Sequence, residues 1–519
     1  RPRRFGKTLN MDMLKCFFSN QYRDQGQLFE GLNIWKEEKY QQLQGTYPVI
    51  YLSFADVKQT NYKDAVLKIK KIITDVYQQY IELAGWEGLT EVQVRQFQSV
   101  DPYMDDVTAQ CALKDLSGYL YRYYEKKVII LLDEFDTPMQ EAYIHGYWDE
   151  FTAFIRSLFN AAFKTNPYLN RAMMTGITRV SKESIFSDLN NLKVVTTTSE
   201  EYATCFGFTQ EEVFTALEEF QLAGQKDAVK QWYDGFTFGS QRDIYNPWSI
   251  TNYLKEKKLL AYWASTSSND LINRLIQTSK PDVKEFMEEL LNEREIVLNF
   301  DEQIVFDQLE TKENAIWSLM VASGYLKIDK IEYRGILHVP WYHLKITNLE
   351  TLGMFSEMFV GWFQNTRSNY NAFIKAMLCG NIKEMNAYMN EVALATFSSF
   401  DTGSHPSGRT QPERFYHGFV LGLLVELRDQ YEVRSNRESG YGRYDVMLIP
   451  RQKNQLAFVL EFKVYDAQEE LKLEDTVQSA LVQIEEKDYD TELIERGISK
   501  SKIRHYGFAF EGKRVLIGE

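Results

Sequence analysis

The sequence predicts an α/β chain of several domains, with a parallel sheet first, a mainly helical region next and a smaller α/β domain at the carboxyl end. Three observations predict this. The chain has 519 residues, more than one hydrophobic core usually organises. Strand-like and helix-like segments alternate up to about residue 200, which is typical of a parallel sheet with crossover helices. A second alternation follows the loop-like stretch at residues 400–412.

Apolar runs mark the expected strands of the first sheet, at residues 47–54, 128–132 and 172–175. Residues 65–83 have the periodicity of a helix. Beyond residue 205 the pattern is mainly helical with aromatic-rich patches, which we interpret as a helical lid followed by a connecting region. After residue 412 we expect a helix at 413–428, a strand pair and further helices. The predicted domains are residues 1–204, 205–400 and 401–519.

Composition and charge restrict the classes of function. Hydrophobic residues make up 44% of the chain and charged residues 25%, so each domain has enough apolar material for a core. No apolar run approaches the roughly 18 residues that span a bilayer, so we expect no membrane role. The formal net charge of -14 is unfavourable for general nucleic-acid binding. Any DNA-binding site must therefore be a local groove. Another subunit, as in a homo-oligomer, could supply further contacts with the strand.

Cysteine and histidine patterns bear on metals and on location. The four cysteines lie far apart without CxxC spacing, at positions Cys16, Cys111, Cys205 and Cys379. This pattern fits neither a zinc site nor a disulfide framework and predicts a reducing, cytoplasmic setting. The six histidines do not pair at metal-ligand spacing either. Carboxylates and phosphates are therefore the expected ligands of a divalent metal, which indicates Mg²⁺ or Mn²⁺.

The first motif is a Gly-Lys-Thr sequence near the start of the chain. Residues 1–8 read RPRRFGKT and end like a phosphate-binding loop, in which backbone N–H groups and a lysine contact phosphates and a threonine hydroxyl contacts Mg²⁺. The first glycine of such a loop would fall at Arg1, so a basic loop before a helix is the alternative. We also expect further residues before Arg1. The candidate ATP-binding residues are Arg4, Gly6, Lys7 and Thr8, and Thr8 is also a candidate Mg²⁺ ligand.

The second motif is an apolar strand that ends in two acids. Residues 128–134 read VIILLDE, the arrangement in which the aspartate orients Mg²⁺ and the glutamate polarises the attacking water. Asp133 is therefore predicted to bind metal and nucleotide, and Glu134 to be catalytic. A simple strand cap is the alternative, but the two motifs occur in the correct order. Thr175, at the end of the next expected strand, could sense the γ-phosphate, whereas Arg179 is more typical of a surface or structural arginine.

A third group of charged residues lies near the carboxyl end. Asp445 opens an apolar strand in GRYDVML, and Glu461 and Lys463 follow in FVLEFK. Residues two apart on a strand share a face, so Asp445 and Glu461 can bind metal while Lys463 orients water and stabilises the phosphate. All three are predicted to be catalytic. A hairpin with a charged outer face is the alternative, but charges within the dense apolar run 457–464 need a partner.

This D…ExK pattern resembles the PD-(D/E)xK nuclease superfamily, with Tyr444 in place of the expected proline. The resemblance implies a further metal-binding glutamate on the preceding helix, at Glu413, although a first-turn acid favoured by the helix dipole is an equal alternative. It also implies a glutamine-containing helix that contacts the nucleic-acid strand near the cut, with Gln478 and Gln483 on that helix and Lys487 and Tyr489 following. For Gln483, an exposed helix residue is an equal alternative. His417 is more typical of a packing residue than of a metal ligand.

The chain as a whole is similar to bacterial AAA-ATPase-like proteins, which combine the loop RPRRFGK(S/T) with a carboxy-terminal PD-(D/E)xK domain. The resemblance covers nearly the whole chain and is carried by residues 1–9, 132–138, 176–180, 186–191 and 233–236. It implies a P-loop NTPase sheet with a helical lid, followed by a restriction-endonuclease-like α/β domain.

These expectations combine into one function. We expect an ATP-binding protein whose nucleotide state controls a Mg²⁺-dependent phosphodiesterase acting on DNA. A non-catalytic, ATP-switched protein that binds nucleic acid or a partner is the alternative. An ATPase that remodels other proteins is a third interpretation, favoured by the acidic net charge and disfavoured by the ExK strand.

Overall fold

The computed structural model describes residues 1–177, 189, 192–264, 269–279, 281–301, 314–363, 367–399, 410–439, 442–452 and 455–519. The chain divides into two compact units. One contains Arg1–Trp263, Asn299–Asp329 and Tyr333–Tyr342, and the other contains Ala264–Leu298, Lys330–Glu332 and His343–Glu519. The domain boundaries expected from the sequence, at 204/205 and 400/401, differ from this division and stay predictions.

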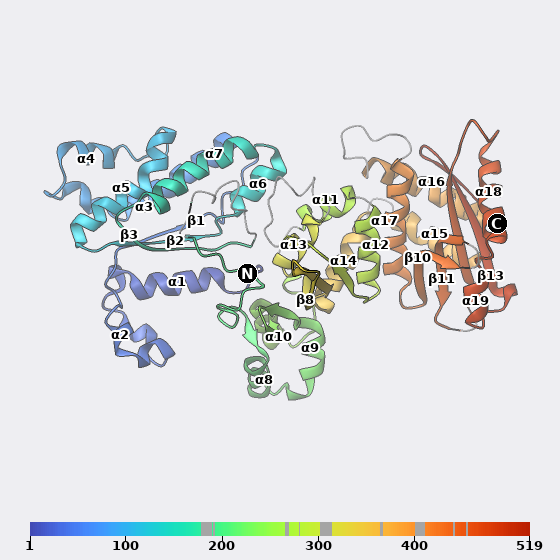
Figure 1. Ribbon diagram of the computed structural model, residues 1–519, viewed down its shortest axis with the longest axis horizontal. Helices are drawn as coiled ribbons and strands as arrows, with labels where there is room; N and C mark the ends of the chain where they lie inside the picture. Colours follow the sequence, from blue (N-terminus) through green and yellow to red (C-terminus); the bar gives the residue numbers. More distant parts are fainter. Residues whose placement is uncertain are drawn as a thin grey trace. The chain divides into compact units, whose positions relative to one another are not determined.

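A parallel sheet with helices on both faces forms the core of the first unit (Figure 1). Its elements are α1 (Lys7–Phe18), α2 (Glu38–Gln41), β1 (Val49–Ser53), α3 (Tyr62–Gln78), α4 (Glu91–Gln98), α5 (Asp106–Tyr124), β2 (Val128–Asp133), α6 (Thr137–His145), α7 (Trp148–Phe159) and β3 (Leu169–Met174). The strand order is β1–β2–β3, with every neighbouring pair parallel. Helix α1 covers one face and α3, α5 and α7 cover the other (Figure 1). The expected parallel sheet is therefore confirmed.

Burial explains why these segments form the sheet. Every residue of β2 is buried, as expected for a central strand covered on both faces. On the α1 face, Met11 packs against Val49 of β1 and against Leu131 of β2. Helix α3 begins three residues before the expected start because the Asn61 side chain accepts a hydrogen bond from the Asp64 N–H and caps the helix.

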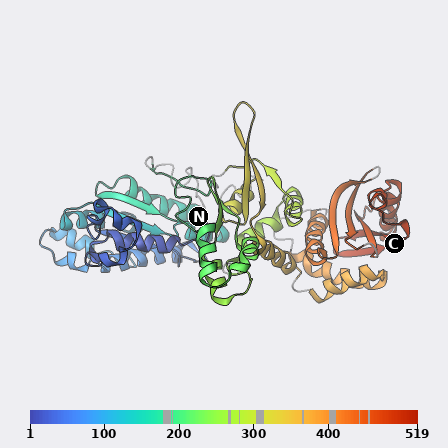
Figure 2. The same cartoon turned by 90° about the horizontal axis from the view of Figure 1, so that it is seen from below.

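The segment after this sheet contains helices and two small sheets that the sequence did not predict. The elements are β4 (Phe208–Thr209), α8 (Gln210–Glu219), α9 (Lys226–Tyr233), β5 (Phe236–Phe238), β6 (Gln241–Tyr245), α10 (Pro247–Glu256), α11 (Asp270–Thr278), α12 (Pro281–Leu291), β7 (Ile296–Leu298), α13 (Ala315–Ala322), β8 (Leu326–Arg334), β9 (Val339–Ile346) and α14 (Leu349–Gly361). The sheets have the orders β4–β6–β5 and β7–β9–β8. Figure 2 shows β8 and β9 as a long hairpin. Strands β4, β5 and β7 have only two or three residues and carry little periodicity. Strands β8 and β9 are longer, with nine and eight residues, and the prediction of a mainly helical region was wrong there.

The second unit contains a mixed sheet of five strands in its described part. The remaining elements are α15 (Arg367–Cys379), α16 (Ile382–Ser399), α17 (Thr410–Leu427), β10 (Tyr431–Ser439), β11 (Gly442–Pro450), β12 (Ala457–Val464), α18 (Leu473–Glu486), α19 (Thr491–Glu495), β13 (Ile503–Glu511) and β14 (Arg514–Gly518). The strands lie in chain order, and only β12 and β13 pair in parallel. Helix α18 connects that pair. The expected strand pair is thus part of a larger sheet.

Helices cover both faces of this sheet, with α16 and α17 on one side and α18 on the other (Figure 1). The close approach of α18 depends on Gly507 of β13, where a Cβ atom would lie 2.8 Å from the Val477 carbonyl oxygen. Gly507 pairs with Glu461 on the neighbouring strand. A larger residue at position 507 would push α18 away from the sheet at the level of Glu461.

The outer edge of β14 is occupied by two asparagines of α16, one helical turn apart. The Asn386 amide accepts from the Ile517 N–H and donates to the Ile517 carbonyl, both at 2.8 Å. Asn390 does the same for Val515, at 2.9 and 2.7 Å. The two side chains therefore satisfy backbone groups that an edge strand otherwise leaves open.

Among the described residues, no helix is both long and apolar enough to cross a membrane.

Candidate functional site

Polar side chains from three elements meet at the carboxyl edge of the parallel sheet. Thr8, in the first turn of α1, donates a hydrogen bond to Asp133 Oδ2 at 2.7 Å. Thr175, directly after β3, donates to Asp133 Oδ1. Asp133 itself ends β2 and is fully buried. The structure therefore brings these three predicted nucleotide-site residues into direct contact, at the sheet edge where ligands of open α/β sheets bind.

Lys7 and Glu134 lie beside this group. The Lys7 ammonium is buried, donates to the Pro2 carbonyl at 3.0 Å and lies 3.6 Å from Glu134 Oε1. Burial raises the pKa of Glu134, while the positive charge of Lys7 opposes that shift. Gly6 precedes α1 with φ of 76°, a left-handed conformation that glycine adopts without strain. The loop thus directs the Lys7 side chain inward, towards the acids that end β2.

Arg4 has a different setting from the other candidates of the loop. Its guanidinium lies over the Trp248 ring, 4.8 Å from the ring centre, at the start of α10. The neighbouring carbonyl of Arg3 accepts a hydrogen bond from the side chain of Asn246, at 3.3 Å. The structure therefore attaches this part of the loop to α10 and does not place Arg4 in contact with Asp133 within the described residues. Arg179 lies outside the described residues.

A second group of charged residues lies on the mixed sheet. Val446 of β11 pairs with Leu460 of β12, so the same register places Asp445 opposite Glu461. Asp445 Oδ2 accepts a hydrogen bond at 2.8 Å from the backbone N–H of Phe462, the residue that follows Glu461. The two carboxyl groups are thus held near each other by the backbone of adjacent strands.

Glu461 is buried and Asp445 is partly buried, and removal from water raises the pKa of both carboxyl groups. Burial is the main cause for each, and for Glu461 the nearby charge of Asp445 raises the pKa further. Glu461 Oε1 accepts a hydrogen bond from Gln483 of α18. Glu461 Oε2 is buried and has no hydrogen-bond partner within the described parts of the chain. A buried acceptor without a donor is costly, and a divalent cation between the two carboxylates would satisfy it.

Helix α18 supplies two contacts to this group from one of its faces. Ser479 accepts a hydrogen bond from the Lys463 ammonium at 3.2 Å, and Gln483, one turn further, reaches Glu461. Gln483 also donates to the Tyr489 hydroxyl at 3.1 Å. The sequence indicated Gln483 and Tyr489 but not Ser479, whose only signal is its spacing of four residues from Gln483. Gln478 is exposed on another face of the helix.

Comparison with known proteins bears on both groups. Residues 1–186 match the family model described as predicted AAA-ATPase, and residues 411–519 match the model of the PD-(D/E)XK nuclease superfamily. The chain carries an AAA-ATPase-like domain followed by a PD-(D/E)XK domain. It is also 23% identical over 522 residues to the "Uncharacterized protein in vnfD 5'region" of Azotobacter chroococcum mcd 1, with 96% of this chain and 86% of that protein covered. No solved structure matches the chain.

Within the PD-(D/E)XK domain, the third expected metal ligand stays a prediction. Position 413 lies in α17, but the side chains of Glu413 and His417 lie outside the described part of the structure. In the described part, no group of three or more His, Cys, Asp or Glu side chains could hold a metal ion. The described ligand set is therefore the pair Asp445 and Glu461.

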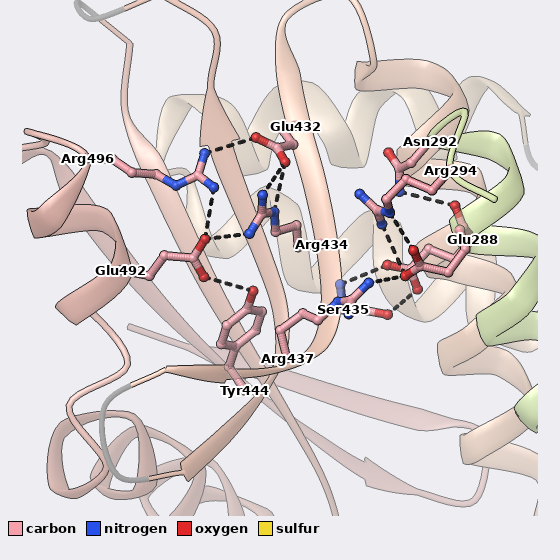
Figure 3. Close-up of polar contacts among 11 residues, drawn as sticks. Glu288, Asn292, Arg294, Glu432, Arg434, Ser435, Arg437, Tyr444, Glu492 and Arg496 are labelled. Atoms are coloured by element: carbon pink, nitrogen blue, oxygen red, sulfur yellow. Dashed lines mark hydrogen bonds and ion pairs between the residues drawn. The ribbon is translucent and has the colours of Figure 1, made fainter. Parts of the chain in front are cut away.

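An ion-pair network supports the strand end that carries Asp445 (Figure 3). Arg434 of β10 pairs with Glu432 and with Glu492 of α19, each at 2.6 Å, and Arg496 pairs with the same two acids. Glu492 also accepts a hydrogen bond from the Tyr444 hydroxyl at 3.3 Å. Tyr444 is fully buried, and the network connects it to both β10 and α19. This network fixes the backbone immediately before Asp445.

Proposed function

We propose that this chain is an ATP-binding protein whose nucleotide state regulates a Mg²⁺- or Mn²⁺-dependent phosphodiesterase acting on DNA. The observation that carries the proposal is the pairing of partly buried Asp445 with buried Glu461, with one Glu461 oxygen unsatisfied and Lys463 two residues further along the strand. The proposed domains are residues 1–204 for the ATPase core, 205–400 for the lid and connecting region, and 401–519 for the nuclease.

In the proposed nuclease site, Asp445 and Glu461 hold the metal ion, with Glu413 as a further ligand. A bound Mg²⁺ or Mn²⁺ supplies Lewis-acid stabilisation of the phosphate and a nucleophilic water. Lys463 orients that water and stabilises the charge that develops on the phosphate. Gln483 holds the Glu461 carboxylate, and Ser479 holds the Lys463 ammonium, so α18 sets the geometry of both groups.

Arg443 is the residue that best supports a phosphate backbone as the substrate. It is exposed two residues before Asp445, and its charge lowers the pKa of Asp445 against the larger effect of burial. Its Nε donates to the Asn436 carbonyl, and within the described residues its guanidinium forms no ion pair. Since Arg434, Arg437 and Arg496 are all paired with acids, Arg443 is the nearby arginine that could meet a phosphate.

In the proposed ATPase site, Lys7 binds the β- and γ-phosphates, while Thr8 and Asp133 hold Mg²⁺. Thr175 is the proposed γ-phosphate sensor, and Gly6 and Arg4 belong to the loop that surrounds the phosphates. The proposal also includes a cytoplasmic setting and a homo-oligomer. The four free cysteines support a cytoplasmic setting. The acidic net charge supports a homo-oligomer, because a single acidic chain binds DNA weakly.

Glu134 is the proposed catalytic base of the ATPase. Glu134→Gln should retain ATP binding, because Lys7, Thr8 and Asp133 remain, but slow hydrolysis by about 10²- to 10⁴-fold through loss of the carboxylate that polarises water. Phosphate release under single-turnover conditions measures this effect, with ATP affinity measured alongside. Equal turnover of variant and parent would reduce Glu134 to a strand cap.

The function as a whole is tested by incubating the full chain with single- and double-stranded DNA, with and without ATP and Mn²⁺. We expect cleavage that needs Mn²⁺ and changes with ATP. Mn²⁺-dependent cleavage that is indifferent to ATP would remove the regulatory link alone. DNA binding without cleavage in any condition would favour the second candidate, an ATP-switched binding protein.

A further inference from the structure

A buried glutamate from outside the matched nuclease region contacts the mixed sheet. Glu288 lies on α12, and its carboxylate accepts hydrogen bonds from both the backbone N–H, at 2.8 Å, and the hydroxyl of Ser435 on β10 (Figure 3). Its side chain is only 5% exposed. The position lies well before residue 411, where the match to the PD-(D/E)XK superfamily begins. Burying a carboxylate is costly, so its contacts on β10 require an explanation.

The contacts of Ser435 continue towards the proposed metal site. Ser435 pairs across the sheet with Val446, the residue after Asp445. The Ser435 hydroxyl also lies beside the hydroxyl of Tyr416 of α17, a second buried side chain. The Tyr416 hydroxyl in turn donates to the Asp445 carbonyl at 2.7 Å. Glu288, Ser435 and Tyr416 therefore form one contiguous polar group, which ends on the backbone carbonyl of Asp445.

The charges around Tyr416 and Glu288 shift the pKa values of both groups. Burial raises the pKa of Tyr416 well above its ordinary value, and the charges of Asp445, Glu288 and Glu461 raise it further. Burial likewise raises the pKa of Glu288 to about 7, although its hydrogen bonds with Ser435 oppose the shift. Tyr416 thus stands among three carboxyl groups.

The adjacent residue, Glu289, has a different role. It pairs with Arg294, at 3.2 Å between Oε1 and Nη2, and with Arg437 on the exposed side of β10. The ion pairs of Glu289 run to these two arginines. The ion pair between Glu289 and Arg437 already attaches α12 to β10. Attachment of the helix therefore does not explain why Glu288 is buried.

We propose that Glu288 is a positioning residue of the nuclease site, which fixes the Asp445 backbone through Ser435 and Tyr416. The inference rests on the proposed function, because it assumes that Asp445 binds the metal. It extends the site to α12, a helix that precedes the PD-(D/E)XK domain in the sequence. Partners of metal ligands orient those ligands, and their loss typically lowers metal affinity or activity by about 10- to 100-fold.

Four variants of the full chain test this proposal, with Mn²⁺ affinity measured by calorimetry and DNA cleavage and melting temperature measured beside it. Glu288→Ala and Ser435→Ala should each weaken Mn²⁺ binding by about 10-fold or more. Glu288→Gln should restore binding, because its amide can accept from the Ser435 N–H and donate to the Ser435 oxygen. Glu289→Ala, the matched control, should lose ion pairs but bind Mn²⁺ like the parent.

Ser435→Ala keeps the backbone N–H that Glu288 accepts from, so this variant remains informative if Glu288→Ala fails to fold. Parental Mn²⁺ affinity in Ser435→Ala would overturn the positioning role while leaving the proposed function intact. Equal loss in Glu288→Gln and Glu288→Ala would overturn it as well. If the parent shows no Mn²⁺ binding that depends on Asp445, both the proposed function and this inference fail.

Discussion

Replacing Asp445 by alanine is expected to abolish DNA cleavage and to weaken Mn²⁺ binding by more than about 100-fold. Loss of a direct ligand should exceed the 10- to 100-fold effect of changing an outer partner. The structure adds a second reason, because Asp445 and Glu461 are held opposite each other and neither carboxylate can substitute for the other. Calorimetry with Mn²⁺ and a cleavage assay on the same preparation measure both effects.

Lys463→Ala is the matched comparison at the same site. It should also abolish cleavage, but leave Mn²⁺ affinity unchanged or slightly higher, since a like charge near the metal is removed. The double variant should cleave no worse than either single variant, because residues of one catalytic unit are not additive. Parental cleavage rates in both single variants would make the domain a binding module instead of a nuclease.

Replacing Lys7 by alanine should weaken ATP binding by about 100-fold or more, because truncating a buried charge that pairs with phosphate costs at least about 3 kcal/mol. Lys7 is buried, and its ammonium lies 3.6 Å from Glu134. Within the described residues, no other lysine forms an ion pair with Glu134. Calorimetry with ATP and Mg²⁺ measures the effect.

Lys15→Ala provides the control for Lys7. Lys15 lies two turns further along α1, where it pairs with Asp12 at 3.6 Å on the partly exposed side of the helix. Its loss should leave ATP affinity unchanged. Parental ATP affinity in Lys7→Ala would remove the proposed nucleotide site.

The sequence predicted the parallel sheet well because five successive apolar residues of β2 are followed by Asp133 and Glu134. A fully apolar strand that ends in acids is typical of the centre of a parallel sheet. The sequence also indicated which strand ends carry polar groups, and the structure brings Thr8, Asp133 and Thr175 into contact. The chemical roles of these residues stay predictions. Arg4 shows the limit of motif reasoning, since its orientation depends on Trp248, far along the chain.

In the mixed sheet, the sequence located Asp445, Glu461 and Lys463 but not their supports. Ser479 and Glu288 belong to no motif, and their contacts depend on how α18 and α12 pack against the strands. Helix packing is set by many weak apolar contacts, so single residues give no local signal of it. The expected strand pair was too small for the same reason, because β13 and β14 are defined by pairing across the sheet.

The asparagines of α16 have a consequence for self-association. An open edge strand is a template on which a second chain can add its own strand, leading to paired dimers or to aggregates. Asn386 and Asn390 already bond the backbone of two alternate residues of β14, Ile517 and Val515, on its outer side. A neighbouring molecule could bond to this edge only by displacing both amides at once. If the chain forms a homo-oligomer, a continuous intermolecular sheet through β14 is therefore disfavoured, and subunits would meet through side-chain surfaces instead.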